Sequence, residues 1–572
     1  MSTSTENSTE NPAKKTAKNS PKNLTTESTA GTSTQDSPHT PPGGFLGTIE
    51  KIGNKLPNPF WLFVILAGLV AVTSWIGAHI GMTATDPQSG ETIAVENLLT
   101  AEGLSKMVTE AVANFTSFPP LGVILAVMLG VAVAEQSGLL SALVRAMVAK
   151  VSPKMLTFVV ALTGVTGSVA SDAIYVILIP LGAMAFHAVG RSPIVGAMVA
   201  FAASSAGFNA SLILNITDLL LGGISTSAAQ IVDEAYEVSP LANIFFVIPS
   251  AVVLSLIITV VTEFFIVRKA RELVDHDDLD TSELDFSAHA PAQSADAQSA
   301  DGQSADAPAA EGQDALSLAP AEARGLMWSG VALLVFLAAF FALIFIPGSP
   351  FASPDGEFMN SPLIRSIAIP ISLAFFLVGA VYGLVVGTIK EAGDFPEFMA
   401  KGLQTLVPMI VLFFMVAQFL AWFSWSNLGV WTAIKGSELL QAWDLPPVLM
   451  FAGLVLMVAL LNLFITSGSA QWALMAPVVV PMLMYVNVSP EVAQMLFRIG
   501  DSPTNIITPM SPYFALALTF LQRYYKRAGV GTLMSLALPY SIAMLVGWFI
   551  FFVIWYLIGI PLGPGSPMTY PA

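Results

Sequence analysis

The feature that most limits the fold of this chain is a series of long apolar segments that contain almost no charge. Each is about as long as the roughly 20 residues that a helix needs to cross a bilayer. Only 11% of the residues are charged and the mean hydropathy is +0.71, whereas soluble domains carry about 25% charged residues. These values predict an all-α membrane protein and exclude an ordinary cytosolic enzyme. A nucleic-acid binder is also excluded, because it would need a basic face.

Nine of the apolar segments are predicted to be transmembrane helices: 57–81, 117–135, 193–222, 240–268, 324–346, 362–390, 403–427, 489–521 and 530–560. Two further stretches, about 153–187 and about 447–487, are each interrupted near the middle by a Gly-Ser cluster. Each half of these stretches is too short to cross the membrane comfortably. Both are therefore predicted to be re-entrant helical hairpins, which enter the membrane and return on the same side.

The basic residues predict the orientation, because lysine and arginine favour the cytoplasmic side of a membrane. With nine spans and two hairpins, the basic clusters all fall inside. The outer loops then hold only Lys106 and Lys435, with Arg365 at the edge of a span. A full span in place of either hairpin would invert the later loops. The prediction is a multi-pass protein of the cell inner membrane with a cytoplasmic N-terminus, an outer C-terminus and hairpins of opposite orientation.

Polar segments divide the chain into parts. Residues 1–56 have no apolar core and are predicted to be a disordered cytoplasmic tail rather than a cleaved signal peptide. Residues 272–322 contain near-repeats of Gln-Ser-Ala-Asp and are predicted to be a disordered cytoplasmic linker. Much of the acid behind the net charge of -16 lies in such polar segments. The remaining parts are a first membrane half (57–271), a second membrane half (323–562) and an outer tail (563–572).

The two membrane halves share a pattern. Each hairpin has a Gly-Ser pair at its tip, a proline twelve residues after that serine, and then a Ser-Pro pair that opens a span broken by polar residues. The matching positions are Gly167, Ser168, Pro180, Ser192 and Pro193 in the first half, and Gly468, Ser469, Pro481, Ser489 and Pro490 in the second. In the second half, Pro503 and Pro509 follow in the broken span. One such residue alone is as well explained by a kink, but the matched breaks favour an inverted repeat.

Inverted repeats with broken helices are typical of secondary transporters. Backbone groups that lose their helical partners are tolerated in a membrane only beside a cavity or a bound solute. Helix N-termini at such breaks attract anions, and freed carbonyls with Ser, Thr and Asn oxygens suit Na⁺. The pattern therefore predicts a solute site where two hairpin tips and two breaks meet, with Na⁺ or H⁺ as the coupling ion and no other cofactor.

Two segments of the second half carry a resemblance to a known family. They are Ser467-Gly468-Ser469-Ala470-Gln471-Trp472-Ala473-Leu474-Met475-Ala476-Pro477 and Arg498-Ile499-Gly500-Asp501-Ser502-Pro503-Thr504-Asn505-Ile506-Ile507-Thr508-Pro509. Together with 167–180 and 207–223, they resemble the AbgT family of p-aminobenzoyl-glutamate transporters over about residues 45–565. The long N-terminal tail and the linker depart from shorter members.

The resemblance implies a homodimer that takes up p-aminobenzoyl-glutamate or exports sulfonamide antimetabolites, a link to antibiotic resistance, but does not distinguish import from export. The expected function is an ion-coupled secondary transporter, or antiporter, of p-aminobenzoyl-glutamate or related aromatic carboxylates. The alternatives are a dicarboxylate or short-anion carrier of the same architecture, and a channel. The family's functional residues match these positions: Arg498, Asp501, Ser469, Pro490, Pro509 and Asp218.

Arg498 is the most informative single residue. A central arginine costs roughly 2.5–3.5 kcal/mol on insertion scales, so it must face protein or water. Asp501 lies three residues later on the same helical face. One interpretation is that Arg498 binds a substrate carboxylate as a bidentate fork, while Asp501 orients it or exchanges a proton. The other is a structural ion pair that neutralises both charges.

Further polar residues are candidates for ion coupling or substrate contact. Asp218, after Asn215 and Thr217, suits a proton-coupled carrier but also a helix cap. Asp172 competes with it and is equally explained as a cap. Small polar residues either contact a cation or substrate or form ordinary bonds between helices: Ser168 and Thr504 for the ion, and Ser469, Asn209 and Asn505 for the substrate. Trp472 is a candidate for stacking on an aminobenzoyl ring, although ordinary packing is the better interpretation.

Other functions lack their motifs. The chain has no cysteine and its five histidines form no cluster, so no metal site is expected. The sequence contains neither the Gly-x-Gly-Asp, Gly-x-Ser-Gly or His-Glu-x-x-His patterns of intramembrane proteases nor a phosphate-binding loop for ATP. We therefore expect a transporter rather than an enzyme, with an anionic small molecule and the lipid bilayer as partners.

Overall fold

The computed structural model describes residues 57–87, 90–148, 151–170, 173–273, 318–346, 348–353 and 361–570. The predicted N-terminal tail, almost all of the predicted linker and Asp172 lie outside these residues. The first half contains α2 (Pro59–Ile80), β1 (Thr83–Thr85), β2 (Thr92–Ala94), α3 (Ala101–Thr109), α4 (Ala111–Thr116), α5 (Pro119–Gln136), α6 (Leu139–Val148), α7 (Leu156–Thr166), η1 (Gly167–Ala170), α8 (Ala173–Ala188), α9 (Pro193–Phe201), η2 (Ala202–Ala206), α10 (Ile216–Ala229), α11 (Ile244–Val261), η3 (Thr262–Ile266) and α12 (Val267–Leu273).

All of the regular secondary structure in the described residues of the second half is helical. It contains α14 (Pro320–Phe345), α15 (Pro362–Arg365), α16 (Ala368–Val386), α17 (Asp394–Trp425), α18 (Leu428–Ala442), α19 (Pro447–Asn462), α20 (Gly468–Met484), α21 (Pro490–Asp501), η8 (Ser502–Ile507), α22 (Pro512–Tyr524) and α23 (Val530–Ile558). Proline in the first turn is common among these helices, because its missing N–H is not needed there. Gly81 and Gly387, with φ of 70° and 87°, end α2 and α16 in the left-handed conformation that glycine adopts readily.

Seven helices in the described part of the chain are long and apolar enough to cross a membrane. They match seven of the nine predicted spans. The other two predicted spans, 193–222 and 489–521, are interrupted: the first consists of α9, the π-helical turn η2 and α10, and the second of α21, the 3-10 turn η8 and α22. The two predicted hairpins are short helix pairs, α7–η1–α8 and α19–α20, which we call the first and second helix pairs.

Some elements differ from the prediction. The short antiparallel strands β1 and β2 pair Thr83 with Ala94, so the fold is not purely helical. Helix α17 begins at Asp394, ahead of the predicted 403, because its first turns are charged and were not counted as apolar. An ion pair between Lys401 and Glu397 lies on that segment. Helix α18 was not predicted, because its mixed composition resembles a loop.

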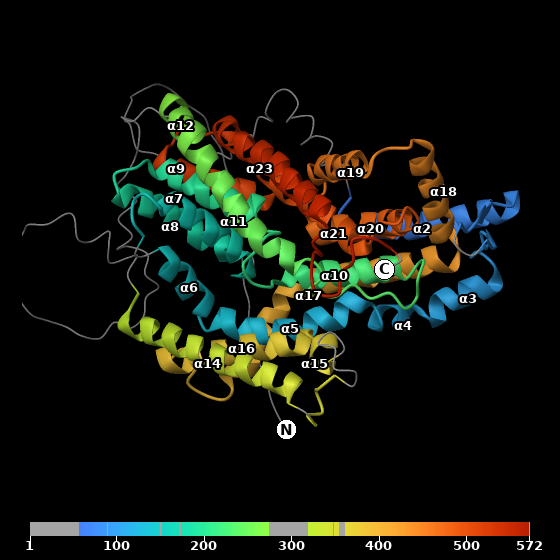
Figure 1. Cartoon of the computed structure of the whole chain (residues 1–572), viewed down its shortest axis with the longest axis horizontal. Helices are drawn as coiled ribbons and strands as arrows, with labels where there is room; N and C mark the ends of the chain where they lie inside the picture. The colour runs from blue at the N-terminus through green and yellow to red at the C-terminus, as the bar shows by residue number, and fades with distance from the viewer. Residues whose placement is uncertain are drawn as a thin grey trace, which may run out of the picture. The chain divides into compact units, whose positions relative to one another are not determined.

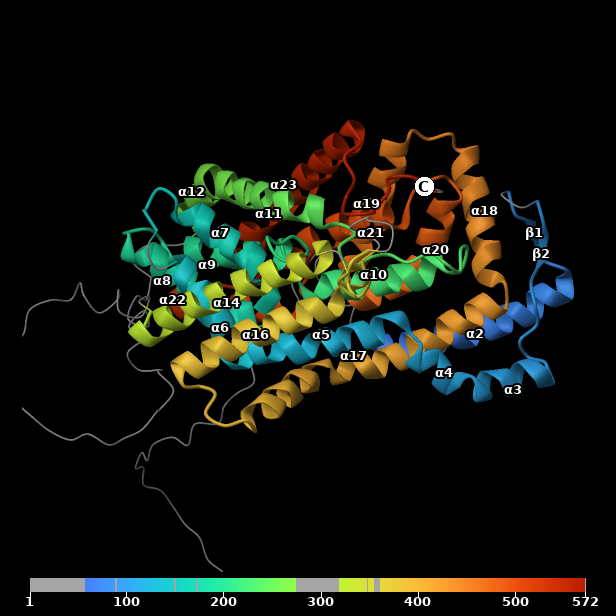
Figure 2. The ribbon, with the colours of Figure 1, turned by 60° about the horizontal axis from the view of Figure 1, so that its bottom comes forward.

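The helices form two groups (Figure 1). The scaffold group is α2, α5, α14, α16 and α17; Figure 2 shows α5 and α17 side by side within it. Small residues let these helices approach closely: a Cβ on Gly130 would meet the backbone of Ser372. The Ser372 hydroxyl also donates to the Ala126 carbonyl at 2.7 Å. The core group comprises the two helix pairs, the two broken helices, α11 and α23.

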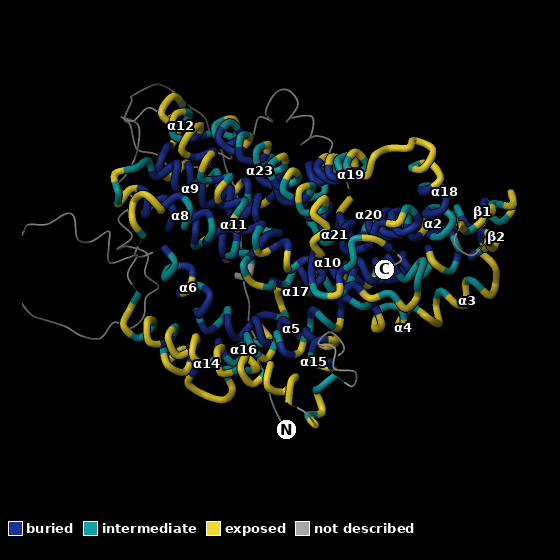
Figure 3. Tube along the Cα trace, viewed as in Figure 1, coloured by how far each residue is buried: buried dark blue, intermediate teal, exposed yellow. Residues whose placement is uncertain are grey.

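Burial differs most between α14 and α21, one helix from each group (Figure 3). In α14 of the scaffold group, only Gly325, Ser329 and Ile344 are buried. In α21 of the core group, every residue is buried, from Pro490 to Asp501. A helix that is polar along one face and buried all round must satisfy its polar side chains within the protein. The core group is therefore where a polar site can exist.

Candidate substrate site

A cavity of about 340 Å³ lies where the two helix pairs and the two broken helices meet. Its size falls in the range of small-molecule sites, roughly 300–1,000 Å³. The first half contributes Ser168, Tyr175, Ser204, Ser205, Phe208, Asn209, Ile216 and Thr217, among others; the second half contributes Thr466, Ser467, Gly468, Ser469, Phe497, Asp501, Asn505 and Tyr513. Met128 of α5 and Thr405 of α17 bring the scaffold group to its wall. The cavity therefore joins both halves and both groups.

The turn of the second helix pair approaches the opposite helix closely. Ser467 caps α20 by accepting a hydrogen bond from the Ala470 amide at 3.4 Å. Glycine suits the next position, because a Cβ on Gly468 would lie 3.1 Å from Asp501 Oδ2 and the carboxylate would have to shift slightly. The Gly-Ser cluster seen in the sequence is therefore explained by contact between the turn and the carboxylate of the second broken helix.

Asp501 and Asn209 join the two broken helices at the cavity. Asn209 Nδ2 donates to Asp501 Oδ2 at 2.8 Å, and both side chains are fully buried. The second oxygen of each, Asn209 Oδ1 and Asp501 Oδ1, has no hydrogen-bond partner in the described part of the protein. Two residues that the sequence predicted as substrate contacts thus meet, although 292 positions separate them.

Asn462, the last residue of α19, forms hydrogen bonds to the second broken helix, and the sequence analysis did not single it out. Its Nδ2 donates to the Asp501 carbonyl at 2.7 Å, to Thr504 Oγ1 at 2.8 Å and to Asn505 Oδ1 at 3.1 Å. The Asp501 carbonyl lies at the change from α-helix to 3-10 turn, and Asn462 supports it together with Thr504 Oγ1, which donates to the same carbonyl at 3.1 Å. The available signal was one asparagine at the end of an otherwise apolar run, and polar residues in such runs usually have partners.

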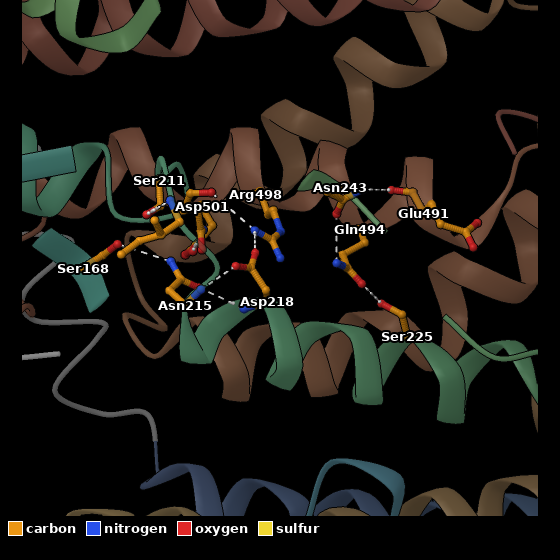
Figure 4. A network of polar contacts seen from close by, with 12 residues as sticks. Ser168, Ser211, Asn215, Asp218, Ser225, Asn243, Glu491, Gln494, Arg498 and Asp501 are labelled. Carbon is orange, nitrogen blue, oxygen red and sulfur yellow. Dashed lines mark hydrogen bonds and ion pairs between the residues drawn. The ribbon is translucent and has the colours of Figure 1, made fainter. Parts of the chain in front are cut away.

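Arg498 pairs with Asp218 of the other half, not with Asp501 as the sequence spacing suggested. Arg498 Nη1 lies 2.5 Å from Asp218 Oδ1, and Arg498 is 1% exposed. Figure 4 shows the two side chains reaching toward each other from α21 and α10. Neither residue lines the cavity. The pair joins the halves behind the cavity wall, where Arg498 Nε has no hydrogen-bond partner in the described part of the protein.

Asp218 is also part of the cap of α10. Asn215 Oδ1 accepts from the Asp218 amide at 3.0 Å, and Asp218 Oδ2 accepts from the Asn215 amide at 2.8 Å. This reciprocal capping box fixes the start of the helix after the first break. Asn215 Nδ2 donates to Ser168 Oγ at 3.2 Å and so ties the cap to the turn of the first helix pair. Asp218 therefore caps α10 and is also a buried carboxylate paired with Arg498.

Trp472 of α20 lies in a second polar cluster, which includes Gln494 of α21. Its indole N–H donates to Ser225 Oγ at 3.0 Å, and Ser225 donates to Gln494 Oε1 at 2.7 Å. Figure 4 shows this cluster continuing through Asn243 toward Glu491. Trp472 packs on Phe497 with ring centroids 4.7 Å apart and does not line the cavity. Ordinary packing, the better interpretation of the sequence, describes its position.

Aromatic side chains form much of the cavity wall, and the sequence did not single them out. Tyr175 and Tyr513 stack in parallel with centroids 3.9 Å apart and planes at 9°. Phe208 and Phe497 also line the cavity. The four residues come from four different elements, so no spacing along the chain predicts them.

The predicted site residues thus fall into three groups. Those that line the cavity are Ser168, Asn209, Ser469, Asp501 and Asn505. Those that lie behind its wall are Arg498, Asp218, Thr504 and Trp472. Asp172 is outside the described residues. The predicted breaks Gly167, Gly468, Pro490 and Pro503 stand at the ends or starts of α7, α20, α21 and η8, and Pro509 follows η8.

A helical membrane protein with such a cavity between two broken helices belongs to the class of membrane transporters rather than enzymes. A family model described as "AbgT putative transporter family" matches residues 44–300 and 295–570. The chain belongs to the AbgT family. It is 36% identical over 524 residues to the p-aminobenzoyl-glutamate transport protein of Escherichia coli K12. The match covers 91% of this chain and 96% of that protein.

Two solved structures are similar to this one. The YdaH transporter of Alcanivorax borkumensis, described as having an unusual topology, is 38% identical with a TM-score of 0.78, and the match covers 89% of this chain and all of that one. MtrF of Neisseria gonorrhoeae, described as illuminating a class of antimetabolite efflux pumps, is 39% identical with a TM-score of 0.82. That match covers 92% of this chain and 100% of MtrF.

Proposed function

We propose that this protein is an ion-coupled secondary transporter of p-aminobenzoyl-glutamate or related aromatic carboxylates, and that it also exports sulfonamide antimetabolites. The observation that carries the proposal is the cavity of about 340 Å³ between the two helix-pair turns and the two broken helices. The name of the Escherichia coli relative supports the substrate, and that of MtrF supports antimetabolite efflux. The aromatic wall favours an aromatic substrate over a dicarboxylate or another short anion.

The proposed topology is nine transmembrane segments and two re-entrant hairpins of opposite orientation. The two broken helices supply the spans beyond the seven long helices. Helices α19 and α20 have 16 and 17 residues, fewer than the roughly 20 of a full span. The turn between them reaches the buried Asp501, which suits a tip inside the membrane domain. The distribution of lysine and arginine supports a cytoplasmic N-terminus and an outer C-terminus, and the family resemblance supports a homodimer.

Asp501 is the proposed coupling residue. It is the acidic residue among those that line the cavity, and one of its oxygens has no partner in the described structure. A carboxylate in that position can take up and release a proton or bind Na⁺. Asp218 is engaged by Arg498 and the α10 cap, so its role is to hold the halves in register. Further side-chain oxygens near Asp501 belong to Ser168, Thr504 and Asn505.

The test is flux of p-aminobenzoyl-glutamate in proteoliposomes, with the substrate on either side and an imposed H⁺ or Na⁺ gradient. We expect one gradient to drive accumulation and Asp501→Asn to abolish it. The matched control is Asp233→Asn, the same exchange in the α10–α11 loop, which should leave accumulation unchanged. Downhill flux without any response to either gradient would overturn the coupling, and no flux in any arrangement would overturn the substrate.

A further inference from the structure

Three buried oxygens on described residues that line the cavity have no hydrogen-bond partner: Ser205 Oγ, which carries its own proton, and Asn209 Oδ1 and Asp501 Oδ1, which can only accept. Asn209 Oδ1 and Asp501 Oδ1, which we call the acceptor pair, have no donor in the described part of the protein. A buried polar group without a partner is unfavourable by about 1–3 kcal/mol, so such groups in a native structure call for an explanation. Both residues line the cavity, and the two side chains are bonded to each other through their other atoms. The pair therefore lies in the cavity wall, just below its surface, and a ligand donor has to enter the wall to reach the two oxygens.

The charge of the cavity narrows the kind of ligand end that fits there. Among the described residues that line it there is no lysine, arginine or histidine, and Arg498 lies behind the wall with its Nη1 on Asp218. A ligand carboxylate beside Asp501 would meet a like charge, and the nearby Arg498 guanidinium already balances the Asp218 carboxylate. An N–H donor suits this position, because each N–H can satisfy one of the two free oxygens.

The aromatic wall adjoins the acceptor pair. The point where a Gly468 Cβ would lie is 3.1 Å from Asp501 Oδ2 and 3.6 Å from Phe208 Cζ, so the Phe208 ring and the carboxylate border the same space. Phe497 lies on the helix that carries Asp501, one turn before it, and also lines the cavity. Aromatic rings pack favourably on such edges and faces. The site thus presents an aryl surface beside two hydrogen-bond acceptors.

We propose that the acceptor pair binds the amino group of a primary aromatic amine, with the aryl ring against Phe208 and Phe497. This inference rests on the proposed function and names the part of the substrate that the cavity recognises. An aromatic amine is neutral near pH 7 and carries two N–H donors for the two oxygens. The p-aminophenyl group is common to p-aminobenzoyl-glutamate and the sulfonamides, so one subsite accounts for both kinds of substrate.

The proposal also implies competition at one atom. A proton on Asp501 Oδ1 turns that oxygen from an acceptor into a donor and removes its partner for the amine. The amine and a coupling proton therefore occupy Asp501 in turn.

The experiment compares ligands with and without the amino group, by equilibrium binding to the purified full chain. The pairs are p-aminobenzoyl-glutamate with benzoyl-glutamate, and sulfanilamide with benzenesulfonamide. Hydrogen bonds that involve a charged group contribute about 1.5–3 kcal/mol, so we expect binding to weaken about 10- to 100-fold on loss of the amine, in both pairs alike. Equal affinity within the pairs would overturn the proposal. This comparison uses the unaltered protein, so it does not depend on whether a variant folds.

A variant sharpens the assignment. Asn209→Leu removes one acceptor at similar size and should shrink the amino-to-des-amino affinity ratio. The control is Asn114→Leu, since Asn114 bonds to Gln418 away from the cavity, and it should keep the ratio of the unaltered chain.

If Na⁺ occupies the acceptor pair instead, saturating Na⁺ will raise the affinity of both members of a pair equally, and loss of the amine will have no effect. If p-aminobenzoyl-glutamate is transported but the ratio is one, this proposal fails while the proposed function stands.

Discussion

The two broken helices have the same plan but satisfy their breaks in different ways. Both start with proline after a serine, at Pro193 and Pro490. The first passes through a π-helical turn and a non-helical stretch before α10, whose capping box is local to Asn215 and Asp218. The second tightens into a 3-10 turn whose polar groups depend on Asn462 of another helix. The helix after the first break thus has a capping box of its own residues, whereas the second break also receives hydrogen bonds from the second helix pair.

The charges are also placed differently in the two halves. The carboxylate of Asp218 follows the first break, and the guanidinium of Arg498 precedes the second. These two charges meet between the two halves, which leaves Asp501 as the carboxylate among the described residues that line the cavity. The two broken helices therefore differ: one charge pair joins the two halves, and Asp501 remains at the cavity.

The largest expected effect comes from breaking the charge pair. Arg498→Met leaves the Asp218 carboxylate buried without a partner and should destabilise the protein by about 3–5 kcal/mol. Adding Asp218→Asn removes the charge but keeps an oxygen for the α10 cap, so the double variant should recover most of that loss. Thermal unfolding in detergent measures both. Arg145→Met is the control, since the Arg145–Glu322 pair is partly exposed and should contribute about 1 kcal/mol or less. A double variant as unstable as the single one would contradict the locking role.

A smaller effect tests whether the second break depends on its neighbour. Asn462→Leu leaves the Asp501 carbonyl without the donor that Asn462 supplies, and this should destabilise by about 1–3 kcal/mol. Asn215→Ala removes a local cap, whose loss is typically about 1 kcal/mol. Hydrogen exchange of the η8 amides should rise in the first variant and stay unchanged in the second. Equal exchange in both variants would remove the distinction between the breaks.

The smallest effect compares the serines that precede the two prolines. Ser489 Oγ accepts from the Val492 amide at 3.3 Å and donates to the Pro567 carbonyl at 2.7 Å. Ser192 forms no side-chain cap bond. Ser489→Ala should therefore lower stability by about 1 kcal/mol, and Ser192→Ala by much less. The apparent melting temperatures of the two variants measure this difference. A larger shift for Ser192→Ala would show that capping does not distinguish the two serines.

Much of the fold followed from the sequence because its causes are local. Bilayer thickness fixes the length of an apolar helix, so the seven long helices were visible as apolar runs. Proline, glycine and clustered polar residues mark breaks for local backbone reasons, as at Pro503 and Gly468. The mixed composition of α18 and the short strand pair gave no such signal.

The site was only partly predictable, and the reason is distance along the chain. The residue types of the site, such as Asn209 and Asp501, stood out as polar groups in apolar segments. The partner of Arg498 lies 280 positions away, and the nearer Asp501 was the wrong choice because helical spacing says nothing about a neighbouring helix. The sequence by itself determined that this is a helical membrane transporter with paired breaks. Only the tertiary structure decided which charges neutralise each other and which acid borders the cavity, because those energies depend on distances between segments that only folding brings together.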